Sequence, residues 1–274
     1  MSSLSESANK TPLKYLLATV LLVGAIISVP IDKILLLLGI KETVNALFIA
    51  NTIVRLIGVA VFGFLFYKFG FINYIKEFNL KGLIVVILPL LVAINNFPFI
   101  AHFKGLGVIT EKGITIILYL VWCLSVALLE ELAFRGIVYP LIKIKLEQKG
   151  TKNPVFWSIA LQGLIFGGMH LLNIFGSNPL AVLLQIGYSF LTGSMFAITL
   201  LYTKNLAVPI ILHFIYNACG LFYDHLGSLG FENHWNLPTI IITAVLAVIT
   251  ITFMVFAVIK KEKKEKDEKF RERI

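Results

Sequence analysis

The sequence predicts an all-α fold, a polytopic transmembrane helical bundle with about eight spans. Of its 274 residues, 58% are hydrophobic and 14% are charged, and the mean hydropathy is +0.89. Soluble globular proteins carry about 25% charged residues, so the composition excludes a water-soluble enzyme, a disordered chain and a collagen-like fibre. A spanning helix needs about 20 apolar residues, which leaves room for about eight spans joined by short loops.

Eight apolar segments follow one another along the chain, and we interpret each as a spanning helix. They are residues 15–38, 44–67, 82–101, 114–142, 155–176, 179–202, 206–223 and 238–259. Pro30, Asp32 and Lys33 interrupt the first segment, which we expect to be an uncleaved anchor because many spans follow it. We therefore expect one transmembrane domain over residues 1–259 and a charged tail over residues 260–274.

The positions of the basic residues predict the orientation in the membrane. In alternate loops and termini, one set holds eighteen Lys and Arg residues and the other holds four. The rich set includes Lys10 and the tail, in which eight basic and five acidic residues follow the last span. By the positive-inside rule, both termini of this multi-pass cell-membrane protein are expected in the cytoplasm. We expect the tail to be solvated, and the net charge of +9 does not indicate nucleic acid.

The fourth segment ends in the motif EExxxR, formed by Glu130, Glu131 and Arg135. Charged residues in a span are costly and usually face the protein interior, where they serve a function. Glu131 and Arg135 are four residues apart with the acid first, which favours an ion pair on one helix face. Glu130 is rotated by about 100°, so we expect it to face another surface and to be free to exchange a proton.

Two further spans carry a histidine among small or polar residues. In the fifth, Gly163, Gly167 and His170 share one face, and small residues at this spacing let a neighbouring helix approach closely. In the seventh, His213 and Asn217 are four residues apart, and Pro209 is expected to open the backbone just before His213. Ordinary interhelical packing is the alternative for each histidine taken alone.

Together, these side chains can support the attack of water on a carbonyl group. Glu130 can take a proton from water that His170 helps to hold, while His213 and Asn217 can donate hydrogen bonds to the developing oxyanion. The same set could instead ligate a catalytic zinc, which needs three protein ligands and an open position.

The three motifs EExxxR (Glu130 to Arg135), FxxxH (Phe166 to His170) and HxxxN (His213 to Asn217) resemble those of the CAAX protease and bacteriocin-processing family of intramembrane endopeptidases. They are in order within residues 114–220, the motif core of the predicted domain. The resemblance implies proteolysis within the membrane, of prenylated CAAX proteins in eukaryotic members and of peptides or membrane proteins in bacterial ones.

The resemblance also implies roles for individual residues. Glu130 is similar to the base that activates water, and His170 to its partner. His213 and Asn217 are similar to oxyanion donors, and Glu131 with Arg135 to a structural or proton-handling pair. We favour a metal-free glutamate mechanism, and the alternative is zinc held by Glu130, His170 and His213.

The estimated depths of two site residues disagree. Glu130 lies near the cytoplasmic end of its predicted span, whereas His170 lies about 24 Å from the cytoplasmic start of its own. The two can meet only if the helices are tilted or begin well outside the bilayer.

Two other functions compete with proteolysis. A non-catalytic membrane protein, acting in bacteriocin self-immunity or partner regulation, would not need the polar set intact. A proton-coupled carrier would favour inverted repeats, whereas here the polar residues concentrate after residue 130. The partners expected for the protease are the bilayer and a peptide or membrane-protein substrate, and the sequence identifies neither the substrate nor the cofactor.

Overall fold

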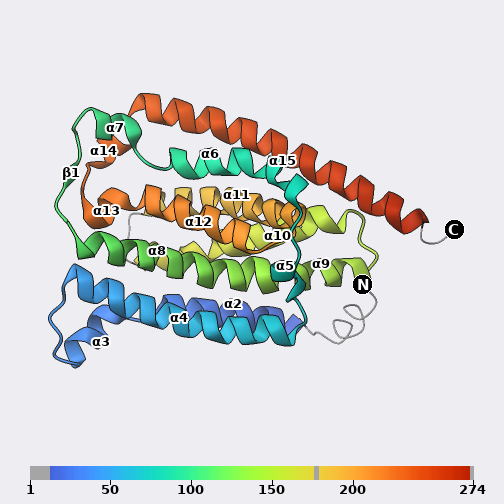
Figure 1. Ribbon diagram of the computed structural model, residues 1–274, viewed down its shortest axis with the longest axis horizontal. Helices are drawn as coiled ribbons and strands as arrows, with labels where there is room; N and C mark the ends of the chain where they lie inside the picture. The colour runs from blue at the N-terminus through green and yellow to red at the C-terminus, as the bar shows by residue number, and fades with distance from the viewer. Residues whose placement is uncertain (1–12, 176–178, 272–274) are drawn as a thin grey trace.

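A computed structural model describes residues 13–175 and 179–271 of the chain, and this part is almost entirely helical (Figure 1). Lys10 and the last three residues of the predicted tail lie outside the described residues. The helices are α2 (Leu13–Ile27), α3 (Ile31–Leu37), α4 (Val44–Lys68), α5 (Asn73–Lys76), η1 (Leu80–Val86), α6 (Ile87–Asn95), α7 (Phe99–Phe103), α8 (Ile114–Ala133), η2 (Phe134–Val138), α9 (Tyr139–Gln148), α10 (Pro154–Met169), η3 (His170–Phe175), α11 (Pro179–Thr203), α12 (Ala207–Gly220), α13 (Phe222–Leu226), α14 (Phe231–His234) and α15 (Leu237–Arg271). Strands β1 (Val108–Ile109) and β2 (Gly227–Ser228) form a short antiparallel pair.

The all-α, polytopic fold class is confirmed, and the described residues of the eight predicted apolar segments are mostly helical, with a break at residues 96–98 in the third. Five helices of the described chain are long and apolar enough to cross a membrane, and α2 with α3 would make a sixth. These two helices meet at an angle of 52°, at the break before Pro30 that interrupts the first predicted segment. The apolar helices Leu80–Asn95 and Ala207–Gly220 are shorter; at 1.5 Å per residue, α12 is about 21 Å long, less than a bilayer core of about 30 Å.

The helices run roughly parallel to one long axis, and α8 and α12 lie in the middle of the bundle (Figure 1). Helices α2 and α4 cover one side, while α6 and α15 lie on the other. All residues from Glu131 to Ile142 are buried, whereas α4 and α15 expose many Leu, Ile and Phe side chains. Exposed apolar surface of this extent suits contact with lipid, so the core of the bundle lies around the end of α8.

The helix that carries the paired acids is longer than predicted. Elements α8, η2 and α9 form one span candidate from Ile114 to Gln148, six residues beyond the predicted end at residue 142. From the turn that joins α9 to α10, Glu130 is about 27 Å along one helix and His170 about 24 Å along the next, at 1.5 Å per residue. The two residues therefore lie at similar depth, and the predicted span boundary caused the disagreement.

Glycines let α10 and α11 pack closely, as the spacing of small residues predicts. A Cβ atom at Gly167 would lie 2.7 Å from the carbonyl oxygen of Ile186 and 3.1 Å from the amide nitrogen of Phe190. A Cβ atom at Gly163 would likewise overlap the side chain of Ser194, which is also on α11. Because the atoms opposite Gly167 are backbone atoms, they cannot move aside by a side-chain rotation.

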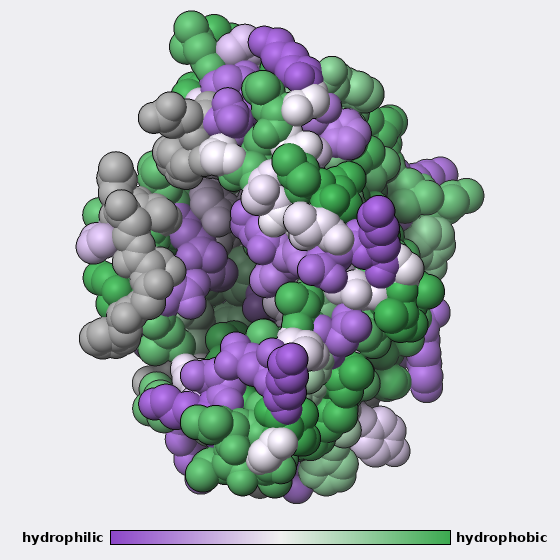
Figure 2. Space-filling model, turned by 90° about the vertical axis from the view of Figure 1, so that its left-hand side faces the viewer, coloured by the Kyte–Doolittle hydropathy of each residue, from purple (hydrophilic) through white to green (hydrophobic). Residues whose placement is uncertain are grey.

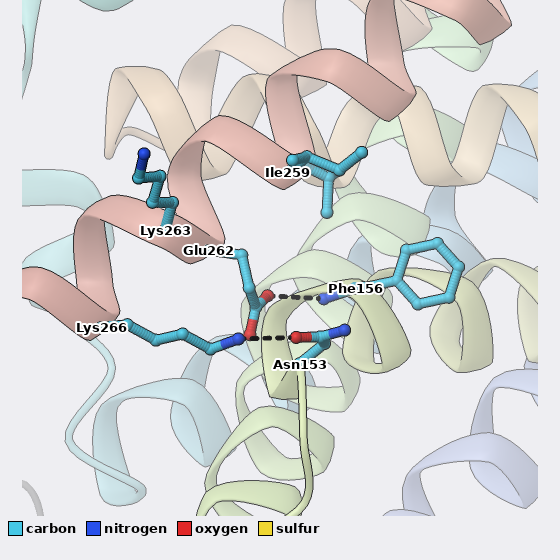
Figure 3. A pocket seen from close by; sticks show the side chains of 7 residues that line it. Asn153, Phe156, Ile259, Glu262, Lys263 and Lys266 are labelled. Carbon is cyan, nitrogen blue, oxygen red and sulfur yellow. Dashed lines mark hydrogen bonds between the residues drawn. The ribbon is translucent and has the colours of Figure 1, made fainter.

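Most described residues of the charged end of α15 are exposed, as expected of a solvated tail, but one side of it contacts the bundle. The Glu262 side chain is only 7% exposed and its carboxylate accepts a hydrogen bond of 3.2 Å from the amide of Phe156, in the first turn of α10 (Figure 3). Lys266 donates a hydrogen bond to Asn153, and Lys143 pairs with Glu265 at 3.2 Å. A carboxylate near a helix N-terminus accepts a hydrogen bond from an otherwise free amide and interacts favourably with the positive end of the helix dipole. Helix α15 therefore stabilises the start of α10.

Replacing Gly167 by Ala should lower the thermal unfolding temperature, because overpacking of this kind costs about 1–3 kcal/mol. Gly168→Ala is the matched control, since no atom lies within 4 Å of the position its Cβ would occupy. Thermal unfolding of both variants in one detergent measures the difference, and equal unfolding temperatures would contradict the close approach of α10 and α11.

Candidate active site

A fully buried ion pair lies at the end of α8. The Oε1 atom of Glu131 is 2.8 Å from Nη1 of Arg135, and both side chains have no exposed surface. The pair predicted from the four-residue spacing is thus confirmed. Glu131 has a second partner on α12, because the same oxygen lies 2.7 Å from Nδ1 of His213. One buried carboxylate therefore joins three side chains from α8, η2 and α12.

Glu130 faces the other nitrogen of the same imidazole. Its Oε2 atom lies 3.7 Å from Nε2 of His213, and its side chain is 13% exposed. The expectation that the two acids face separate surfaces is therefore wrong: they lie on two sides of one His213 ring. A protonated imidazole can donate to both carboxylates, and the charges of the four side chains then sum to zero. Of the two acids, only Glu130 is exposed, so it is the one that water can reach.

Two aromatic rings enclose the cation of the ion pair. The guanidinium carbon of Arg135 lies 4.3 Å from the ring centre of Phe166 and 5.5 Å from that of Phe196. A cation over an aromatic face is stabilised by the ring quadrupole, which offsets part of the cost of burying this charge. Arg135 belongs to the π-helical turn η2, an irregularity frequent at functional sites.

His170 lies at the end of α10, where that helix tightens into η3. Its Nδ1 atom is 3.1 Å from the carbonyl oxygen of Phe166, and the two rings are in contact with centroids 5.4 Å apart. The Phe166 ring also contacts His213, at 6.1 Å between centroids. His170 is therefore joined to the cluster through Phe166, and its ring nitrogens form no direct hydrogen bond with Glu130.

Asn217 follows His213 by one turn on α12 and is half-buried. Its backbone carbonyl accepts a hydrogen bond of 3.2 Å from the hydroxyl of Tyr119 on α8. Pro209 does not open this helix, contrary to the expectation, because α12 begins at Ala207 and Pro209 lies in its first turn. The amides of a first turn have no partner within the helix in any case.

The would-be zinc ligands do not form a ligand group. Within residues 13–175 and 179–271, no three His, Cys, Asp or Glu side chains are arranged to hold a metal ion. Glu130 and His213 contact each other, but His170 is held by Phe166, and Glu131 is occupied by Arg135 and His213. This arrangement does not fit a zinc held by Glu130, His170 and His213, and the chemistry derived below uses only the protein's own groups.

The end of the molecule that carries α3, α7 and α13 is hollowed, with hydrophilic side chains along part of the hollow (Figure 2). A separate pocket of about 250 Å³ lies at the opposite end, between α10 and α15 (Figure 3). Asn153, Phe156, Ile259 and Lys263 are among its lining residues, and it contains none of the predicted site residues.

Residues 112–219 match a family described as type II CAAX prenyl endopeptidase Rce1-like. This segment is similar to that family. It contains all three motifs, so the resemblance inferred from them is confirmed, and the match supports an intramembrane protease. No curated protein and no solved structure matches the chain.

Several residues of the cluster were not predicted from the sequence. Phe196 of α11 contacts both Arg135 and His213, the latter with 5.3 Å between ring centroids. Gln162 is fully buried and donates a hydrogen bond of 2.9 Å to the carbonyl oxygen of Gly193. Gly193 itself lies against Arg135, because a Cβ atom on this glycine would be 3.1 Å from Nη2 of the arginine. The only sequence signal for a role of Gln162 was that it is a polar residue within an apolar run. Phe196 is an apolar residue within an apolar run, so the sequence carries no signal for it.

Arg135→Met should destabilise the protein by about 3–5 kcal/mol, because it leaves the buried carboxylate of Glu131 without its cation. The double variant Glu131→Gln/Arg135→Met removes both charges and should recover a large part of this loss. Thermal or denaturant unfolding of the two variants in detergent measures the difference. A double variant no more stable than Arg135→Met would contradict a mainly electrostatic role for the pair.

Proposed function

We propose that this protein is an intramembrane endopeptidase that hydrolyses a peptide bond with water activated by Glu130. The observation that carries the proposal is the unequal placement of the two acids around His213. Glu131 is fully buried and ion-paired, whereas Glu130 is partly exposed and lies 3.7 Å from Nε2 of His213. An acid that is accessible and beside a hydrogen-bond donor can exchange a proton with water, as a general base must.

In the proposed reaction, Glu130 takes one proton from water as the water oxygen bonds to the carbonyl carbon. The carbonyl oxygen becomes an oxyanion, which accepts hydrogen bonds from Nε2 of His213 and from the side-chain amide of Asn217. The carbon–nitrogen bond then breaks, and Glu130 gives its proton to the departing amine. The products are a carboxylic acid and an amine, and Glu130 returns to its ionised form.

Glu131 and Arg135 act in this proposal by holding His213. The Glu131 carboxylate accepts from Nδ1 of His213, which fixes the ring orientation, and the ring also donates from Nε2, the nitrogen that faces Glu130, when it is an imidazolium. This is the way a buried carboxylate orients a histidine in other hydrolytic sites. Arg135 supplies the counter-charge to that carboxylate, at 2.8 Å.

His170 orients the attacking water in the proposed site. Its Nδ1 atom donates to the Phe166 carbonyl oxygen, which leaves Nε2 of a neutral ring as an acceptor for a water hydrogen. The placement of Phe166 between His170 and His213 fixes both rings relative to one another.

We further propose a multi-pass cell-membrane protein with both termini in the cytoplasm, as the distribution of Lys and Arg predicts. The start of α2 and the end of α15 lie at the same end of the bundle (Figure 1), which agrees with this orientation. The substrate is a peptide or a membrane protein, cut by a domain whose motif core is residues 114–220. Bacteriocin self-immunity or partner regulation without catalysis is the competing function, and the variants below separate the two.

Glu130→Gln should lower kcat/KM by at least about 10³-fold while the protein stays folded, since the amide cannot accept the proton from water. Cleavage of a peptide library by purified protein in lipid vesicles measures this effect. Glu77→Gln is the matched control, because Glu77 pairs with Lys204 on the exposed surface. Full activity of folded Glu130→Gln would exclude the proposed mechanism, and a wild type that cuts nothing while the variant keeps its cellular phenotype would favour the non-catalytic function.

Cleavage should persist after treatment with a strong zinc chelator, because the proposed steps use protein groups alone. Dialysis of the purified protein against the chelator, followed by the same peptide assay, tests this expectation. Loss of activity that added zinc restores would instead establish a metalloprotease.

A further inference from the structure

Arg55 is a charged residue in the middle of span candidate α4 that the proposed mechanism does not use. Its Nη1 atom donates to the backbone and side-chain oxygens of Asn51, at 3.2 and 2.7 Å. These are its only hydrogen bonds within the described residues, and no carboxylate there lies within 4 Å of it. A charge at the centre of a bilayer costs roughly 2.5–3.5 kcal/mol on translocon scales, so an unpaired arginine at this position needs an explanation.

Arg55 is rigidly held beside the α8 helix. Its guanidinium lies over the ring of Trp122, at 5.6 Å. Trp122 is itself packed between Phe48, at 5.6 Å, and His225, at 4.7 Å between ring centroids. With Asn51 fixing one nitrogen and Trp122 supporting one face, the orientation of the guanidinium is set before any ligand binds.

Arg55 also lies close in depth to Glu130. Gly58, one turn after Arg55, faces Leu129 so closely that a Cβ atom would lie 2.6 Å from its side chain. Arg55 is therefore about one helical turn, roughly 5 Å, from the level of Glu130.

The free edge of Arg55 has the geometry of a carboxylate receptor. With Nη1 bound to Asn51, the Nε and Nη2 hydrogens remain, and these two point the same way from the planar group. Such a fork binds both oxygens of one carboxylate, with greater strength and directionality than a lysine. If Arg55 served only to balance the charge of Glu130, a cation of any shape would be sufficient, and this free pair of N–H groups would not be needed.

We propose that Arg55 is a specificity-determining residue that binds a carboxylate of the peptide substrate. This inference rests on the proposed function. An extended peptide advances about 3.3 Å per residue, so a level about 5 Å from Glu130 places that carboxylate within about two residues of the cleaved bond. It can belong to an Asp or Glu side chain or to the peptide's own C-terminus.

The test uses the full chain in lipid vesicles and one cleaved peptide in three forms. The first form keeps every carboxylate within two residues of the cut, the second replaces the acidic side chain by its amide, and the third carries an amidated C-terminus. The wild type should prefer the form with the carboxylate by about tenfold or more in kcat/KM, and the form that loses this preference identifies the source of the carboxylate.

Arg55→Gln should erase this preference by raising KM for the carboxylate peptide to the value for the neutral peptide. Arg55→Lys should recover it only in part. Lys68→Gln is the matched control, because it removes an exposed positive charge from the end of the same helix. A preference that survives in Arg55→Gln, or an equal fall of kcat on both peptides, would overturn the proposal.

Binding provides a readout that is independent of cleavage. Fluorescence anisotropy of the labelled peptides with folded Glu130→Gln protein should show tighter binding of the carboxylate form, and adding Arg55→Gln should remove the difference. Failure of the wild type to cut any peptide would count against the protease function, while this comparison would still decide the role of Arg55. Equal binding of all forms would overturn it.

Discussion

The burial of the Glu131 carboxylate is the constraint on which the rest of the site depends. A charge without exposed surface is tolerated only with close partners, and Glu131 obtains them from η2 and α12. Removal of Arg135 or a shift of α12 by one turn would each take away one of these partners. The packing register of α8 against α12 is therefore set by charge pairing as well as by apolar contacts.

This constraint extends to the helices behind the cluster. Phe166 of α10 and Phe196 of α11 contact both the Arg135 guanidinium and the His213 ring. For these rings to be in place, α10 and α11 must approach each other closely, which Gly163 and Gly167 permit. Small residues on one helix pair thus contribute to the enclosure of a charge on another.

Local spacing was sufficient to predict much of the fold and part of the site. The eight helical segments followed from hydropathy, and the pairing of Glu131 with Arg135 followed from a separation of one helical turn. The contact of both acids with His213 could not be predicted, because it depends on the packing of α8 against α12, which are distant in sequence. The same holds for Phe196, whose apolar side chain is indistinguishable in the sequence from any lipid-facing neighbour.

Helix boundaries were the weaker part of the sequence prediction, for a physical reason. Apolar runs end where charges begin, yet a helix continues wherever those charges find partners or water. Glu130 appeared to lie near a span end only because Lys143 and Lys145 were expected to lie outside the helix, which in fact continues to Gln148.

The contact between Glu262 and the first turn of α10 makes the charged end of α15 a part of the folded unit. The hydropathy profile would place a domain boundary at residue 259, yet a chain cut there would lose the carboxylate that accepts from the Phe156 amide and the lysine that binds Asn153. The helix loosened by such a cut is the one that ends at His170, about 24 Å away at 1.5 Å per residue. Shortening or tagging this end of the chain would therefore reach the candidate site through the rigid body of a single helix.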